Sequence, residues 1–138
     1  MLKAIIDAWN GNAGVEEAND GTKLQFEDVR ALVARRDPSV VLVDAREPSE
    51  FSVVQIPGSI NVPYKSHPEG FSLSPEEFAR TFGTPKPDTG KDMVFFCASG
   101  MRAGKARDVA IKNGYTNTKI YPGSMNDWVA HGGDKLKL

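Results

Sequence analysis

Segments typical of β-strands alternate with segments typical of α-helices along most of this 138-residue chain. Residues 39–45 and 92–96 are nearly continuous apolar runs, as expected of strands that a parallel sheet buries on both faces. Residues 26–36 and 102–113 instead carry apolar side chains at helical spacing. This alternation predicts an α/β layer sandwich built on a mainly parallel sheet.

Shorter elements are expected between and after these segments. Pro75 directly after Ser74 marks a helix start, because serine caps a helix and proline fits its first turn. The other expected elements are a short helix at 48–54, strands at 60–62 and 119–121, and a helix at 124–131 that Ser124 would cap.

The first 23 residues differ from the rest of the sequence. Apolar residues recur at helical spacing between Leu2 and Trp9 and predict a short amphipathic helix, and a flexible connector follows at 10–22. We therefore expect a helix and connector over 1–23 and a single domain over 24–138. The helix either packs on that domain or acts as a weak organelle-targeting or membrane-surface element.

The composition excludes several classes of function. Lys plus Arg number 17 and Asp plus Glu number 18, so the net charge of -1 provides no basic field to attract nucleic acid. The apolar runs are far shorter than the roughly 18 residues of a transmembrane helix, so we expect no transmembrane segment. One cysteine and two histidines allow no internal disulfide and leave little material for a metal site.

The only cysteine occupies the position where chemistry is expected. Cys97 directly follows the strand predicted at 92–96. A short loop containing Gly100 then leads into a predicted helix that begins near Arg102. Ligands of open α/β sheets bind at the carboxyl ends of the strands. Inward backbone N–H groups of a curled loop and the positive end of a helix both favour a thiolate. A lone cysteine after a strand is commonly a small buried side chain, but this context favours a nucleophile for an anionic substrate.

Four motifs make the chain from Leu24 to Gly133 similar to the rhodanese (thiosulfate sulfurtransferase) superfamily. Each motif alone is a weak indicator, whereas four in the right order and spacing are strong. The chain most resembles fungal single-domain thiosulfate sulfurtransferases of mitochondria, which implies a mitochondrial location, with the cytoplasm as the alternative. The motifs are Val41–Glu47 with its Asp-x-Arg sequence, Gln55–Asn61, the loop Cys97–Arg102 and Tyr121–Trp128.

The resemblance implies a rhodanese-like three-layer sandwich, with a mainly parallel five-stranded sheet and helices on both faces. It implies a two-step transfer through a persulfide on Cys97, from a small anionic donor such as thiosulfate to a thiol, to cyanide or to a protein sulfur acceptor. Arg102 would hold the sulfonate end of the donor, and no cofactor or metal is needed. The loop that binds the donor would consist of Ala98, Ser99, Gly100, Met101 and Arg102.

Asp44 and Arg46 follow another strand end and are expected near Cys97 as supporting residues. They would form either a charged wall of the pocket or an ion pair that braces the active turn, and we favour the brace. Glu50 lies four residues after Arg46 and is its expected partner. Many relatives carry His where this chain has Gln55, and because glutamine does not titrate near neutral pH, we take this position as structural.

Two other functions share this scaffold. One is a non-enzymatic rhodanese-like module for binding or for carrying sulfur, although such modules typically lack the cysteine. The other is a phosphatase of the dual-specificity type, whose loop has five residues between cysteine and arginine, whereas four separate Cys97 from Arg102. The smaller loop should fit a sulfur atom and crowd a phosphate.

Overall fold

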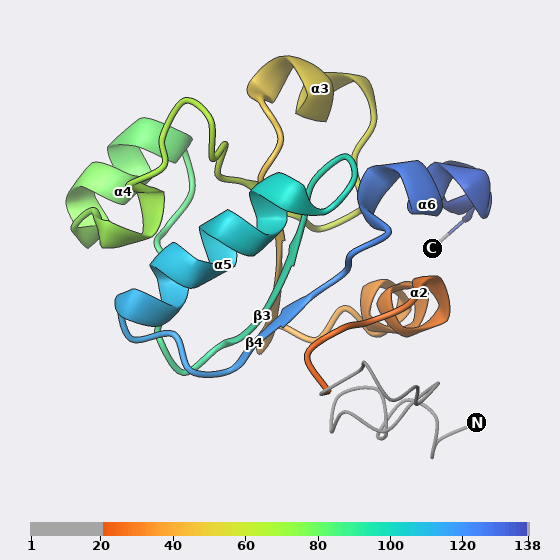
Figure 1. The fold of residues 1–138 in the computed structure, drawn as a ribbon, viewed down its shortest axis with the longest axis horizontal. Coiled ribbons are helices and arrows are strands. Elements are labelled where there is room, and N and C mark those ends of the chain that lie inside the picture. The colour runs from red at the N-terminus through yellow and green to blue at the C-terminus, as the bar shows by residue number, and fades with distance from the viewer. Residues whose placement is uncertain (1–20, 138) are drawn as a thin grey trace.

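The computed structural model describes residues 21–137, which form an α/β fold around a parallel sheet (Figure 1). The sheet has the strand order β2-β1-β3-β4. The helix and most of the connector expected over 1–23 lie outside the described residues. The strands are β1 (Val40–Asp44), β2 (Ile60–Asn61), β3 (Asp92–Phe96) and β4 (Thr118–Ile120).

Helices cover both faces of this sheet, and α3 lies beyond the carboxyl ends of the strands (Figure 1). The predicted elements agree with the observed ones to within one residue at each end. They are α2 (Phe26–Arg35), α3 (Pro48–Val53), α4 (Pro75–Phe82), α5 (Met101–Lys112) and α6 (Ser124–Ala130), with short 3-10 helices at Gly70–Ser72 and Gly133–Lys135.

The expectation of five strands is wrong for residues 21–137, where the sheet has four. The chain at 22–24 does run beside β4, where Leu24 N donates to Ile120 O at 2.8 Å and Ile120 N donates to Thr22 O at 2.7 Å. However, the pairing amounts to one isolated parallel bridge between Lys23 and Ile120. A single bridge takes the place of the fifth strand because the chain enters α2 directly afterwards.

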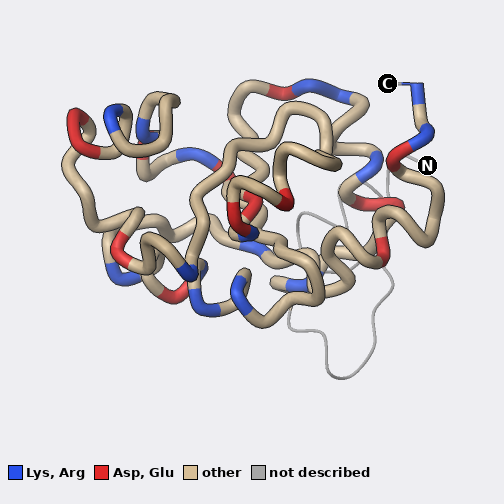
Figure 2. Tube along the Cα trace, turned by 90° about the horizontal axis from the view of Figure 1, so that it is seen from above, with Lys and Arg blue, Asp and Glu red and all other residues tan. Residues whose placement is uncertain are grey.

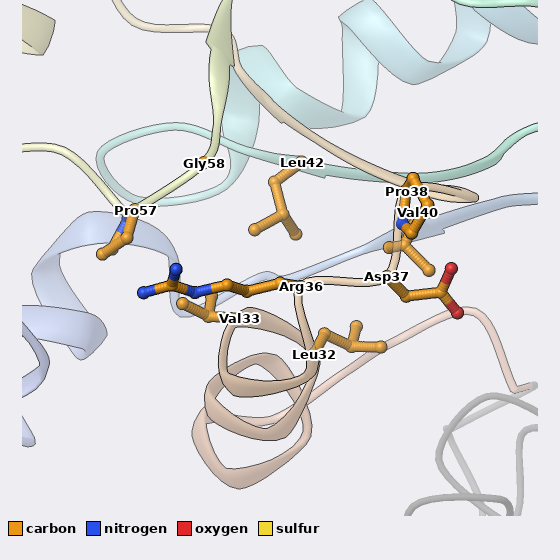
Figure 3. Close-up of a pocket in the computed structure, with 9 residues that line it drawn as sticks. All are labelled: Leu32, Val33, Arg36, Asp37, Pro38, Val40, Leu42, Pro57 and Gly58. Atoms are coloured by element: carbon orange, nitrogen blue, oxygen red, sulfur yellow. The ribbon is translucent and has the colours of Figure 1, made fainter. Parts of the chain in front are cut away.

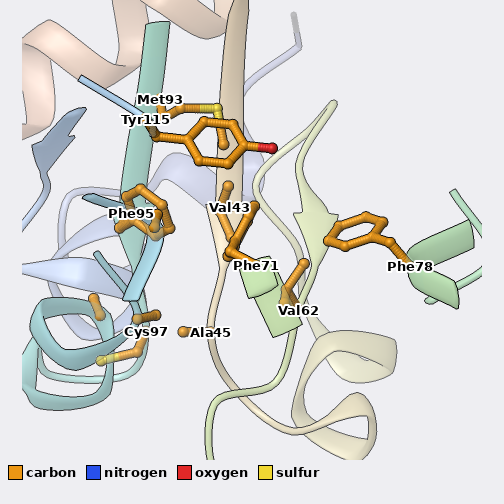
Figure 4. Close-up of a cluster of buried hydrophobic side chains, with 12 residues drawn as sticks. Val43, Ala45, Val62, Phe71, Phe78, Met93, Phe95, Cys97 and Tyr115 are labelled. Atoms are coloured by element: carbon orange, nitrogen blue, oxygen red, sulfur yellow. The ribbon is translucent and has the colours of Figure 1, made fainter. Parts of the chain in front are cut away.

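The two faces of the sheet form two hydrophobic cores, because successive strand residues point to opposite sides. Val94 and Phe96 belong to the core under α2 and α6, which also contains the fully buried Trp128. Met93 and Phe95 belong to the core under α4 and α5 (Figure 4). The side of α5 that faces this core carries three alanines, whose small side chains let the helix lie close to the sheet, namely Ala103, Ala106 and Ala110.

The two predicted serine caps have different outcomes. Ser74 caps α4, since its hydroxyl accepts a hydrogen bond from Glu77 N at 3.2 Å. Ser124 does not cap α6, whose N-cap residue is Gly123 and has no side-chain cap. Ser124 is instead fully buried with a φ of 60°, and its hydroxyl points to another part of the chain.

Candidate active site

The loop that begins at Cys97 joins the end of β3 to the start of α5 at the carboxyl edge of the sheet (Figure 1). Cys97 is 1% exposed, and its sulfur points toward the turn that leads into α5 (Figure 4). Its Sγ accepts a hydrogen bond from the Gly100 N–H at 2.9 Å. The chain therefore folds back on its own sulfur and places a backbone dipole directly against it.

Gly100 makes this tight turn possible. Its φ is 106°, in the left-handed region that side chains disfavour. A Cβ added to Gly100 would lie 2.7 Å from the carbonyl oxygen of Pro122. The close approach of the loop to the segment after β4 thus requires glycine, and the position of the Gly100 N–H against the sulfur depends on it.

The segment after β4 braces the loop from the other side. The Ser124 hydroxyl accepts a hydrogen bond from Cys97 N at 3.0 Å and donates one to Tyr121 O at 2.9 Å. Met125 N donates to Cys97 O at 2.8 Å, so both backbone polar groups of the cysteine are held by α6. Sequence reasoning missed this role of Ser124, because a serine at a helix start is typical of a cap. The available signal was its place shortly after the last predicted strand, since the carboxyl ends of parallel strands meet at the edge of the sheet where Cys97 lies.

The guanidinium of Arg102 pairs with the carboxylate of Glu50 on α3. Nη1 of Arg102 lies 2.8 Å from Oε1 of Glu50, and Nη2 lies 3.2 Å from Oε2. The expected pairing of Glu50 with Arg46 is wrong, because Asp44 occupies the guanidinium of Arg46. The pair links the first turn of α5 to α3, which places a cation and an anion together beside the cysteine loop.

This pairing fixes the charge state of both side chains. Hydrogen bonds from the Arg102 guanidinium lower the pKa of Glu50 to about 2, partial burial opposes the shift, and the Glu47 N–H adds to it. The same hydrogen bonds raise the pKa of Arg102. Both groups are therefore charged at neutral pH, and the pair as a whole carries no net charge.

Asp44 and Arg46 form a buried ion pair after β1. Asp44 is 0% exposed and Arg46 is 4% exposed, and Nη2 of Arg46 lies 2.8 Å from Oδ2 of Asp44. Asp44 Oδ1 also accepts from Arg46 N at 2.9 Å, while Arg46 Nη2 donates to Val54 O at 2.6 Å. Asn61 completes the group by donating from Nδ2 to Arg46 O at 2.7 Å. The two charges contact each other and the backbone that flanks α3, which favours the brace over a charged wall.

The remaining predicted loop residues are more exposed than Cys97. Ala98 is half-buried, Ser99 is exposed and Met101 is 74% exposed. The structure thus brings a buried sulfur, a bound amide N–H and a nearby guanidinium into one loop with a solvent-facing rim. Such a loop can present a thiolate to a small anion that arrives from solvent.

A cavity of about 460 Å³ lies between the end of α2 and the start of β1 (Figure 3). None of the described residues that line it belongs to the loop from Cys97 to Arg102. The arginine beside it, Arg36, extends along the cavity from the end of α2 (Figure 3). This cavity is therefore separate from the candidate active site.

Three further findings concern residues 21–137 as a whole. None of the helices in this part of the chain has the length and apolar character needed to cross a membrane. Within the same residues, no group of three or more His, Cys, Asp or Glu side chains is placed to hold a metal ion. Figure 2 shows basic and acidic residues mixed along the described chain rather than separated into regions of one sign.

Several known proteins are similar to this chain. The family model of the rhodanese-like domain matches residues 25–131. A thiosulfate:glutathione sulfurtransferase of Saccharomyces cerevisiae is 55% identical over 139 residues, which covers 100% of both chains. A mitochondrial thiosulfate sulfurtransferase of the same yeast is 42% identical over 112 residues, covering 81% of this chain and 75% of that protein. The crystal structure of a single-domain sulfurtransferase of this yeast has a TM-score of 0.81 and 40% identity, covering 85% of this chain and 95% of that chain.

Proposed function

The chain belongs to the rhodanese family, and on that premise we propose that it transfers sulfane sulfur from thiosulfate, or from a persulfide donor, to a thiophilic acceptor through a persulfide on Cys97. The observation that carries the proposal is the hydrogen bond from the Gly100 N–H to Sγ at 2.9 Å. A fixed backbone donor stabilises negative charge on sulfur, both in the attacking thiolate and in the persulfide that replaces it.

In the first step, the Cys97 thiolate attacks the outer sulfur of thiosulfate. An S–S bond forms between the two sulfur atoms while the bond from the outer sulfur to the sulfonate breaks, and its electron pair leaves with sulfite. The terminal sulfur of the new persulfide carries the negative charge. The Gly100 N–H and the positive end of α5 support that charge.

In the second step, the acceptor, either a thiolate or cyanide, attacks the terminal sulfur of the persulfide. A bond from the acceptor to that sulfur forms while the S–S bond to Cys97 breaks, so a thiolate becomes a persulfide, cyanide becomes thiocyanate, and the Cys97 thiolate is regenerated as the leaving group. Because the chain has one cysteine, it holds no second thiol that could take the sulfur over. The acceptor is therefore an outside molecule, such as glutathione, cyanide or a protein thiol, and the name of the relative with 55% identity supports glutathione.

The position of Arg102 supports a role in binding the sulfonate end of the donor. Its guanidinium has five N–H donors, and two of its nitrogens bind Glu50. N–H groups remain for a sulfonate, and Arg102 lies in the first turn of α5, directly after the loop that begins at Cys97. Ala98, Ser99 and Met101 complete the proposed donor-binding loop, while Asp44 and Arg46 support it from the end of β1.

The alternatives fit the site less well. A module that only binds a partner needs no cysteine held by a backbone N–H, and a phosphatase of the dual-specificity type needs a loop one residue longer. We therefore expect no turnover of an aryl phosphate. A phosphatase rate that disappears in a Cys97 variant would favour the phosphatase instead.

We further propose that residues 24–138 fold as one domain and that the protein acts in mitochondria. The match of the family model to 25–131 supports the first, and the mitochondrial relative with 42% identity supports the second, with the cytoplasm as the alternative. Imaging of the tagged full chain and of a chain lacking residues 1–14 tests the location. Equal mitochondrial signals would remove residues 1–14 from any targeting role.

Steady-state kinetics test the proposed function. Sulfite release is measured while thiosulfate and glutathione are varied together. Since the sulfur rests on the protein between the two steps, a ping-pong pattern with parallel double-reciprocal lines is expected. Converging lines would require both substrates to be bound together, and absence of sulfite release would remove the proposed function.

Replacement of Gly100 by alanine is expected to lower kcat/KM for sulfur transfer by about 100-fold, because the loop must move and withdraw its N–H from the sulfur. Gly90→Ala is the matched control, since nothing lies within 4 Å of a Cβ added there. It should retain the wild-type rate. Wild-type kinetics for Gly100→Ala would show that the tight turn is not needed.

A further inference from the structure

We propose that Glu50 is a positioning residue that determines how strongly the site binds donors of different charge. Its carboxylate offsets the positive charge of Arg102 and so weakens the binding of doubly charged donors and products. The inference rests on the proposed sulfur transfer and concerns the same site. Through Glu50, α3 therefore contributes to substrate selection together with the cysteine loop.

The Glu50 carboxylate is held in place independently of Arg102. It closes the capping box of α3, where Glu47 N donates to Oε1 of Glu50 at 3.0 Å. That oxygen also faces Nη1 of Arg102 at 2.8 Å. Because α3 holds the carboxylate, the negative charge stays beside the guanidinium whether or not a substrate is bound.

Solvent has access to this pair. The Arg102 side chain is 27% exposed and the Glu50 side chain is 37% exposed. A small anion can therefore approach the guanidinium, but it meets the carboxylate at the same place.

The charges decide what such an anion experiences. Thiosulfate carries two negative charges, and so does sulfite at alkaline pH. Arg102 attracts them, whereas Glu50 repels them from nearly the same position, so the two effects largely cancel. Removal of the Glu50 charge leaves the attraction of Arg102 uncompensated, and the gain in binding is proportional to the charge of the ligand. In the wild-type protein, the cancellation weakens donor binding and eases the departure of sulfite.

Glu50→Gln tests this inference, because glutamine at the same helix position can still accept from Glu47 N and keep the cap. For Glu50→Gln, KM for thiosulfate and the inhibition constant of sulfite should each fall about tenfold. KM for benzenethiosulfonate, a singly charged donor, should fall only about threefold. The change in its electrostatic interaction energy with the site is half that of the doubly charged thiosulfate. We expect kcat to stay within about twofold of wild type.

Glu27→Gln is the matched control. Glu27 is an exposed residue of α2 whose carboxylate lies 3.8 Å from Arg30, and its loss changes the net charge by the same amount. Its kinetics should equal those of wild type. An unchanged or higher KM for thiosulfate in Glu50→Gln, or equal falls for both donors, would overturn the role of Glu50. Wild-type protein that releases no sulfite would instead remove the proposed function itself.

Discussion

Cys97→Ser is expected to lower kcat/KM for sulfur transfer at least about 1,000-fold and to leave the fold intact. Serine is close in size to cysteine, and its hydroxyl oxygen can still accept the Gly100 N–H that the sulfur accepts now. The variant therefore removes the sulfur nucleophile while keeping the loop hydrogen bond. Sulfite release from thiosulfate, in the presence of glutathione, measures the loss.

Cys97→Ala serves as the companion variant, since it removes both the sulfur and the hydrogen-bond acceptor. Both variants should lose activity to the same extent, and thermal unfolding should establish that both are folded. Activity of Cys97→Ser within tenfold of wild type would contradict a persulfide on this residue. Loss of activity together with loss of the folding transition would show that the substitutions act through the fold.

Asp44→Ala is expected to lower the free energy of unfolding by about 3–5 kcal/mol, because it leaves the Arg46 guanidinium charged, buried and without its carboxylate. Typical domains have only about 5–15 kcal/mol of stability in total, so this loss is severe. Urea denaturation at neutral pH measures the change. The effect should appear in stability first, since the pair faces the backbone around α3 and not the sulfur.

The double variant Asp44→Ala with Arg46→Met separates a buried ion pair from a simple cavity. Methionine removes the second charge and retains much of the volume, so the double variant should be more stable than Asp44→Ala alone. Glu27→Gln, which breaks an exposed pair, should change the stability by less than about 0.5 kcal/mol. If the two substitutions instead destabilised additively, the two charges would not depend on each other.

Most of the fold could be predicted from local patterns in the sequence. The apolar run of β3, the Ser74-Pro75 start of α4 and the alanine face of α5 each have a physical reason that operates within a few residues. The prediction of a five-stranded sheet is wrong for a different reason. The number of strands is implied by the family resemblance and not by a local pattern. In this chain, the segment around Lys23 contributes only one bridge before α2 begins.

The position of Cys97 at the end of β3 could also be predicted, but its immediate partners could not. The spacing of four residues predicts that Glu50 pairs with Arg46, because such pairs are favoured on a helix. Its true partner, Arg102, lies 52 residues away in sequence, and no local pattern records the distance between the start of α5 and α3. A serine at a helix start likewise predicts a cap, whereas the actual contact of Ser124 with Cys97 depends on the pairing of β3 with β4, which no local pattern shows.

The mass of the intact protein after incubation with thiosulfate, without any acceptor, tests the persulfide most directly. The protein should gain the mass of one sulfur atom per chain, peptide mapping should place that atom on Cys97, and glutathione should return the mass to its starting value. An unchanged mass during sulfite release, or the same gain in Cys97→Ser, would contradict transfer through this cysteine.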